Sequence, residues 1–137
     1  NMFATVFFGA LDPQTGRLRY VNGGHDAPLV VRRDGQRQRL APTGPALGLM
    51  PGAPFAVDAT DLAPGDTLAL FTDGACDATG TDGAFFTEER LLDLLAAPAP
   101  SADALLDRID AALAAHNQET TPFDDVTLLA VRRAEPA

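Results

Sequence analysis

Two acidic features border the most apolar strands that the sequence predicts. Asp73 follows the apolar residues 67–72, and Asp124 with Asp125 precedes the apolar residues 126–131. If the two segments pair as antiparallel strands, these acidic ends lie side by side. Clustered carboxylates repel one another unless a cation or a proton lies between them, and ligand sets made only of oxygen suit Mg²⁺ or Mn²⁺. Taken singly, each feature is also typical of an ordinary turn or strand lead-in.

Few other residues have the types and spacing that a catalytic or ligand-binding site requires. No base or oxyanion hole is indicated beside Cys76, so we do not expect a nucleophilic thiol. Residues 22–24 are rich in glycine but lack the spacing and the following helix of a nucleotide-binding loop. His25 is expected to be a hydrogen-bonded turn residue. The arginines of the predicted hairpins are expected to form one solvated face, with the docking of a phosphoprotein as the alternative; they are Arg17, Arg19, Arg32, Arg33, Arg37 and Arg39.

The elements that must position these residues change in kind along the chain. The first half predicts strands at residues 3–10 (buried), 17–21, 29–32, 37–40, 56–60 and 67–72. Turn residues at 12–16 and 33–36 join neighbouring strands into hairpins. The second half predicts helices that begin after Thr87 and Ser101, and then a last strand at 126–131. Antiparallel strands followed by helices indicate the α+β class.

Composition excludes several classes of protein. The chain has 137 residues, which is the size of one domain or part of one. Its 19 acidic and 10 basic residues give a net charge of -9, so we expect no nucleic-acid partner and no membrane insertion. A single cysteine excludes an internal disulfide, and no apolar run approaches the roughly 20 residues that span a bilayer. No signal peptide is visible, and we therefore expect a cytoplasmic protein or a piece of one.

Five short segments together form a more specific pattern. Residues 22–28 read Asn-Gly-Gly-His-Asp-Ala-Pro between two predicted strands, and the other four segments are Met-Phe-Ala-Thr at 2–5, Phe-Thr-Asp-Gly-Ala at 71–75, Phe-Thr-Glu-Glu-Arg-Leu at 86–91 and Asp-Asp-Val-Thr at 124–127. Their types and order resemble the metal-dependent (type 2C, PPM) protein serine/threonine phosphatases, in the SpoIIE-like bacterial branch. At 22–28 that branch usually has Asn-Ala-Gly-His-Asn-Pro-Pro.

The resemblance implies a fold and an activity. The fold is an α/β/β/α four-layer sandwich of two antiparallel sheets flanked by helices, and this chain would be its C-terminal portion over residues 1–133, with a tail at 134–137. The activity is the hydrolysis of phosphoserine or phosphothreonine in a protein by water that two Mn²⁺ or Mg²⁺ ions activate.

The resemblance also implies roles for individual residues. By position in the family pattern, Asp73 and Asp124 would be metal ligands, and Gly74 would leave room for the metal and water. Asp77 and Asp125 would be accessory carboxylates, although the family usually has the longer Glu where Asp77 stands.

One part of the family pattern does not occur in these residues. The first metal-binding motif, an Asp-Val-x-Gly-His-Gly-like segment with a bridging Asp, is absent, and Asn1 runs straight into an apolar stretch. We therefore expect that the domain begins before this chain, and that the chain alone binds metal weakly and has little activity. The alternative is a non-catalytic protein-interaction module derived from the same fold. A calcium-binding β domain is disfavoured because the chain has no loop of the EF-hand type.

The family also implies partners. These are a phosphorylated regulatory protein of the anti-anti-sigma type and an upstream sensor or receiver domain. A sheet with an open strand edge further predicts a possible homodimer.

Overall fold

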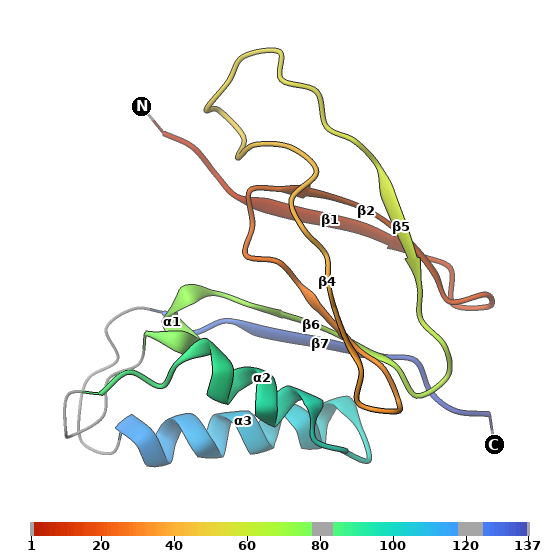
Figure 1. Cartoon of the computed structure of the whole chain (residues 1–137), viewed down its shortest axis with the longest axis vertical. Coiled ribbons are helices and arrows are strands. Elements are labelled where there is room, and N and C mark those ends of the chain that lie inside the picture. The colour runs from red at the N-terminus through yellow and green to blue at the C-terminus, as the bar shows by residue number, and fades with distance from the viewer. Residues whose placement is uncertain (1, 78–83, 118–124, 137) are drawn as a thin grey trace.

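The computed structural model describes residues 2–77, 84–117 and 125–136 as two antiparallel sheets with helices over one of them (Figure 1). The strands are β1 (Val6–Leu11), β2 (Arg17–Gly23), β3 (Leu29–Val31), β4 (Arg37–Arg39), β5 (Asp58–Asp61), β6 (Thr67–Phe71) and β7 (Leu128–Arg132). The helices are α1 (Asp73–Cys76), α2 (Glu88–Ala96) and α3 (Ala102–Asn117). One sheet has the strand order β1-β2-β5, and the other has the order β4-β3-β6-β7.

Local turns build the two hairpins that the sequence predicts. In the turn between β1 and β2, the Asp12 carboxylate accepts hydrogen bonds from the backbone N–H groups of Gln14 and Thr15, and Gly16 has φ +80°. A Cβ atom at Gly16 would lie 2.1 Å from the carbonyl oxygen of Leu62, so only glycine fits there. In the turn between β3 and β4, Gly35 has φ +89°.

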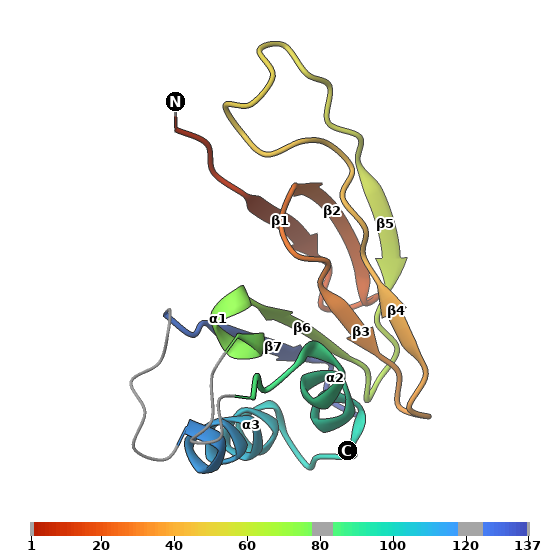
Figure 2. The same ribbon diagram turned by 60° about the vertical axis from the view of Figure 1, so that its left-hand side comes forward.

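The central strands of the second sheet, β3 and β6, are buried on both faces and so separate two apolar clusters. One cluster fills the space between the sheets and consists of Leu18, Tyr20, Val30, Leu40, Leu62 and Leu68. The other lies between the second sheet and the helices and includes Leu29, Val31, Ala69, Phe71, Leu91, Leu95, Leu105, Ile109 and Leu113. The alternation of neighbouring residues such as Leu29 and Val30 between the clusters is the period of a strand. The predicted α+β fold with two antiparallel sheets is confirmed, and in the described residues α2 and α3 cover one outer face (Figure 2).

The predicted helix starts are also confirmed. The Thr87 hydroxyl accepts a hydrogen bond from the N–H of Arg90 at 3.4 Å, and the Ser101 hydroxyl accepts one from the N–H of Ala104 at 3.1 Å. Arg108 of α3 donates to the carbonyl oxygens of Leu94, Ala97 and Pro98, where α2 ends. A cation at this end complements the helix dipole and ties the two helices together.

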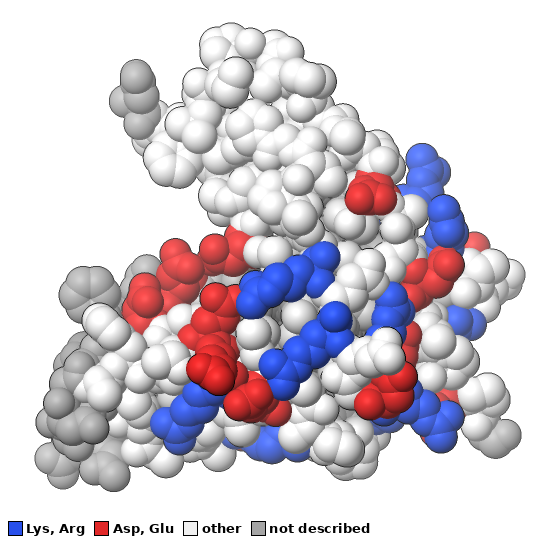
Figure 3. Space-filling view, viewed as in Figure 1, with Lys and Arg blue, Asp and Glu red and all other residues white. Residues whose placement is uncertain are grey.

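The strand predicted at residues 3–10 is present, but its predicted start and its predicted burial are wrong. The strand begins at Val6, and the side chains of Phe3 and Phe8 are 62% and 69% exposed. They are exposed because β1 is an edge strand and no described element covers the outer face of its sheet. Around them lies a charge-poor surface, seen in the upper part of Figure 3, whose exposed apolar side chains are Met2, Phe3, Phe8, Leu47, Leu49, Met50, Phe55 and Val57.

Within the described residues, no helix combines the length and the apolar character needed to cross a membrane.

Candidate functional site

The ends of β6 and β7 meet as the acidic pattern predicts. The two strands are antiparallel neighbours, with Phe71 opposite Leu128. Pairing continues beyond them, because the N–H of Thr72 donates to the carbonyl oxygen of Thr127 at 3.1 Å and the Thr72 hydroxyl accepts from the N–H of Thr127 at 3.1 Å. Asp73 therefore lies at the same end of the sheet as Asp125, which is exposed. Asp124 lies outside the described residues.

Asp73 opens a short helix rather than the simple turn that Asp-Gly suggests. α1 begins at Asp73, and the N–H of Asp77 donates to the Asp73 carbonyl oxygen at 2.9 Å. Gly74 and Ala75 are buried within it. This turn of helix brings Asp73, Cys76 and Asp77 to the wall of one cavity.

The cavity is lined by side chains from four separate segments. Its volume is about 420 Å³, and its lining residues are Asp26, Ala27, Arg39, Phe71, Asp73, Cys76, Asp77, Phe85, Thr87 and Glu88. We call it the acidic cavity because four of these residues carry carboxylates. It contains two of the predicted site residues, Asp73 and Asp77, and it also contains Asp26, which the sequence reasoning missed.

The carboxyl groups of Asp26 and Asp73 interact directly. Partial burial, a hydrogen bond with Asp73 and the charge of Asp73 together raise the pKa of Asp26 to about 6. Two carboxyls this close favour a shared proton or a bound cation. A signal for Asp26 was present in the sequence, because this aspartate stands where the family pattern has asparagine.

The loop that carries Asp26 is held by a buried amide. The side chain of Asn22 donates to the carbonyl oxygens of Leu40 at 3.0 Å and His25 at 3.2 Å, and it accepts from the N–H of His25 at 2.9 Å. Gly24 has φ +70°, and a Cβ there would lie 2.8 Å from the backbone nitrogen of Ala46. His25 is the turn residue that was predicted, since its ring Nδ1 is 2.7 Å from the carbonyl oxygen of Asp26.

Cys76 is unsuited to nucleophilic attack, as predicted. Burial and then the charges of Glu88, Asp77, Asp73 and Asp26 raise the pKa of its thiol to about 11. A thiol with this pKa is almost wholly protonated near neutral pH.

The donors that the structure places in the acidic cavity fit a hard cation in type. Paired carboxylate oxygens are ligands that Mg²⁺ and Mn²⁺ prefer. Within residues 2–77, 84–117 and 125–136, no three His, Cys, Asp or Glu side chains are grouped closely enough to hold a metal ion. Asp73 with Asp26 would thus supply part of a ligand set.

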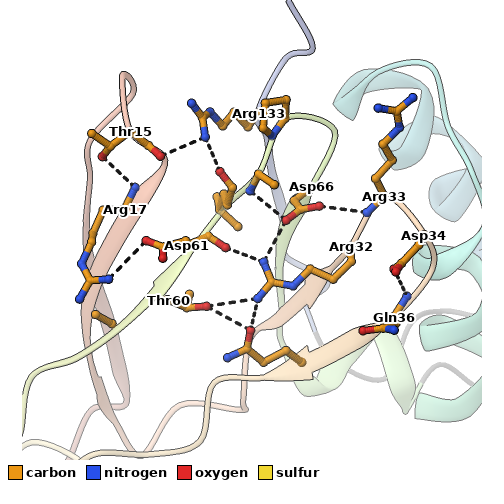
Figure 4. Close-up of a pocket in the computed structure, with 15 residues that line it drawn as sticks. Thr15, Arg17, Arg32, Arg33, Asp34, Gln36, Thr60, Asp61, Asp66 and Arg133 are labelled. Carbon is orange, nitrogen blue, oxygen red and sulfur yellow. Dashed lines mark hydrogen bonds and ion pairs between the residues drawn. The ribbon is translucent and has the colours of Figure 1, made fainter.

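A larger cavity, of about 1050 Å³, lies away from these carboxylates and is structural in character (Figure 4). Arg32 forms an ion pair with Asp66 at 2.9 Å, and Asp66 also accepts from the N–H groups of Arg33 and Ala63 at 2.9 Å each. Burial by itself would raise the pKa of Asp66, but the hydrogen bonds from these groups and the charge of Arg32 bring it below its ordinary value. The Arg32–Asp66 ion pair and its hydrogen bonds therefore connect the two sheets.

This network corrects the prediction that the hairpin arginines form one solvated face. Arg32 bonds to Gln38 and Thr60 inside the molecule, and Arg17 pairs with Asp61 at the outer sheet. Arg37 and Arg39 instead pair with Asp93 and Glu88 of α2. Strand alternation and the separation of the two sheets disperse these side chains.

Comparison with known proteins agrees with this geometry. Residues 1–134 match the family described as Stage II sporulation protein E (SpoIIE). The chain is 39% identical to Protein IcfG of Synechocystis sp. over 132 residues, covering 96% of this chain and 21% of that protein. The chain thus spans about a fifth of the length of this relative.

Solved structures give the same result. The RsbU and RsbW domains of Rv1364c from Mycobacterium tuberculosis match with a TM-score of 0.73 and 32% identity, covering 97% of this chain and 38% of that one. The phosphatase domain of SpoIIE from Bacillus subtilis (Mn presoaked) matches with a TM-score of 0.72 and 15% identity, over 98% of this chain and 58% of that one. The predicted family is confirmed: the chain belongs to the SpoIIE family of PPM-type phosphatases.

Proposed function

We propose that this chain is the C-terminal portion of a metal-dependent phosphatase domain that removes phosphate from serine or threonine of a regulatory protein. The observation that carries the proposal is the meeting of Asp73 with Asp26 in the acidic cavity, at the end of the paired strands β6 and β7. Membership of the SpoIIE family supports the same activity.

The residues of the proposed metal site have distinct tasks. Asp73 and Asp124 hold Mn²⁺ or Mg²⁺, Asp77 and Asp125 orient the site as accessory carboxylates, and Gly74, which is buried in α1, leaves room for the metal and water. When bound, the two metal ions lower the pKa of a water molecule and stabilise the charge that develops on the phosphoryl group. Manganese was used with the Bacillus subtilis SpoIIE phosphatase domain, which supports the same choice here.

The proposed active domain includes polypeptide beyond this chain. The first metal-binding motif of the family is not found in the 137 residues, and the similar structures are longer. The charge-poor surface around Phe3 and Phe8 is the kind of surface that another layer covers. We therefore propose that the chain alone hydrolyses little substrate. The non-catalytic interaction module is the second candidate, and the same missing motif favours it.

The proposed setting is cytoplasmic signalling. The substrate is a phosphorylated protein of the anti-anti-sigma type, and a sensor or receiver domain acts upstream. One solved relative carries RsbU and RsbW domains in a single protein, which supports a regulatory partner. A homodimer through an open strand edge is a further proposal.

Calorimetric titration with Mn²⁺ tests the proposed site. We expect measurable binding by the chain that is lost in both Asp73→Asn and Asp124→Asn. Asp61→Asn is the matched control, since it removes the same charge from an exposed ion pair at the outer sheet. Equal binding by all four proteins would contradict the assignment of these ligands. Hydrolysis of para-nitrophenyl phosphate should then appear only when the natural preceding polypeptide is present, and robust turnover by the chain alone would contradict the proposed division of the domain.

A further inference from the structure

Two arginines of β4 extend along α2 beside the acidic cavity. Arg37 and Arg39 are two residues apart and so point to the same side of the strand. They lie opposite Val31 and Leu29, whose side chains pack toward the helices. Arg37 pairs with Asp93 at 2.9 Å, and Arg39 pairs with Glu88 at 2.6 Å.

The two arginines differ in one respect that matters for function. Arg39 lines the acidic cavity, and Arg37 does not. Among the described residues that line this cavity, Arg39 is the one with a positively charged side chain. The side chains of Arg39 and Glu88 are 49% and 47% exposed, so this pair lies at the mouth of the cavity.

The guanidinium of Arg39 has donors to spare. Its five N–H groups point in a planar fork, and the Nη1 atom is the one that contacts Glu88. Among the described residues, the ion pair with Glu88 is the one contact that the structure gives this guanidinium, so its other nitrogen atoms can bind an anion while that contact is kept.

We propose that Arg39 binds the phosphoryl oxygens of the substrate at the mouth of the acidic cavity, with Glu88 orienting its guanidinium. This inference rests on the proposed phosphatase function. A phosphate monoester that approaches the carboxylates of Asp26, Asp73 and Asp77 is repelled by them, so a cation at the entrance has a clear role. A guanidinium fork matches two phosphate oxygens at once, which a lysine ammonium does not. Glu88 holds the long side chain in place and thereby reduces the entropy lost on binding.

The test measures phosphate binding and catalysis separately, in the natural protein that contains this chain, with Mn²⁺ present. Calorimetry gives the Kd of inorganic phosphate, and hydrolysis of para-nitrophenyl phosphate gives KM and kcat. For Arg39→Ala we expect both the Kd and the KM to rise about tenfold, with a smaller change in kcat. A tenfold rise corresponds to the loss of one hydrogen-bonded contact to a charged group. Arg39→Lys should recover part of the loss, because it restores the charge without the fork.

Arg37→Ala is the matched control, since it removes an arginine from the same strand face and the same helix but not from the cavity. It should leave the Kd and the KM unchanged. Glu88→Gln keeps a side-chain oxygen but loses the charge that holds the guanidinium, so its phosphate Kd should lie between those of the wild type and Arg39→Ala. Thermal unfolding of each variant confirms that these exposed substitutions leave the fold intact.

The outcomes separate this inference from the proposed function. If the wild type hydrolyses the ester and Arg39→Ala behaves as Arg37→Ala does, the role of Arg39 is wrong and the phosphatase stands. If the wild type hydrolyses nothing but its phosphate Kd depends on Arg39 and not on Arg37, the anion site stands and the proposed function fails. If the wild type binds no phosphate, the role of Arg39 is wrong.

Discussion

The carboxyl groups of Asp26 and Asp73 share a hydrogen bond in the acidic cavity, although they come from different parts of the chain. Asp26 lies in the segment that leads from β2 of one sheet to β3 of the other, and Asp73 follows β6, the strand that pairs with β3. The contact therefore joins the connection between the two sheets to the end of a central strand.

This contact predicts a pH-dependent cost to stability in metal-free buffer. The pKa of Asp26 is raised from 3.8 to about 6 in the folded chain, so the folded state favours the protonated carboxyl. Its contribution to stability is complete below pH 3.8 and is lost as the pH rises through about 6. Because the site is partly open to solvent, we expect Asp26→Asn to raise the free energy of unfolding at pH 7.5 by only about 1 kcal/mol. Urea unfolding with EDTA at pH 3.5 and 7.5 measures this, and a gain of equal size at both pH values would contradict it.

The Arg32–Asp66 ion pair predicts the opposite pH dependence. The pKa of Asp66 lies below 3.8 in the folded chain, so its stabilising contribution is present above pH 3.8 and is lost as the pH falls through the folded value. At pH 7, Asp66→Asn should lower the free energy of unfolding by about 2 kcal/mol, because it leaves the Arg32 charge and two backbone N–H groups poorly paired. Asp61→Asn should cost less than about 0.5 kcal/mol, since its pair with Arg17 is exposed. Similar losses from both variants in urea unfolding would show that burial does not distinguish these pairs.

Arg133 links the segment after β7 to the outer sheet. Its guanidinium donates to the carbonyl oxygens of Leu62 at 2.7 Å, Thr15 at 3.0 Å and Gln14 at 2.8 Å. We expect Arg133→Ala to lower the free energy of unfolding by about 2 kcal/mol, because these bonds are charge-assisted. Arg33→Ala is the control, since its pair with Glu135 is more exposed, and it should change stability little. Thermal or urea unfolding of both variants checks the difference.

The environment of Cys76 predicts slow alkylation. With a pKa of about 11, the thiol should react with iodoacetamide at pH 8 at least about tenfold more slowly in the folded chain than in urea. Among the nearby carboxylates, Glu88 contributes most to the raised pKa, so Glu88→Gln should speed the reaction. Equal rates in the folded and unfolded chain would contradict the raised pKa.

Features that depend on neighbouring residues were predictable from the sequence. The hairpins follow from short turns such as the one at Asp12 and Gly16, and α2 begins at the capping residue Thr87. The placement of Asp73 at the end of β6 followed from the apolar pattern and the acidic ends of two strands. Such features need few residues to specify them, because their hydrogen bonds form between residues close in the chain or along one strand pair.

The tertiary structure alone decided which distant residues meet. The apolar pattern of residues 3–10 predicts burial, yet Phe8 is exposed, because a pattern shows which side chains avoid water and not which element covers them. Arg32 and Arg39 both stand in predicted strands of one hairpin. The packing of the sheets nevertheless places Arg32 beside the buried Asp66, and it places Arg39 beside Glu88 at the acidic cavity. The pairing of Asp26 with Asp73 depends in the same way on how two sheets and a short helix pack together, and no local residue pattern specifies that arrangement.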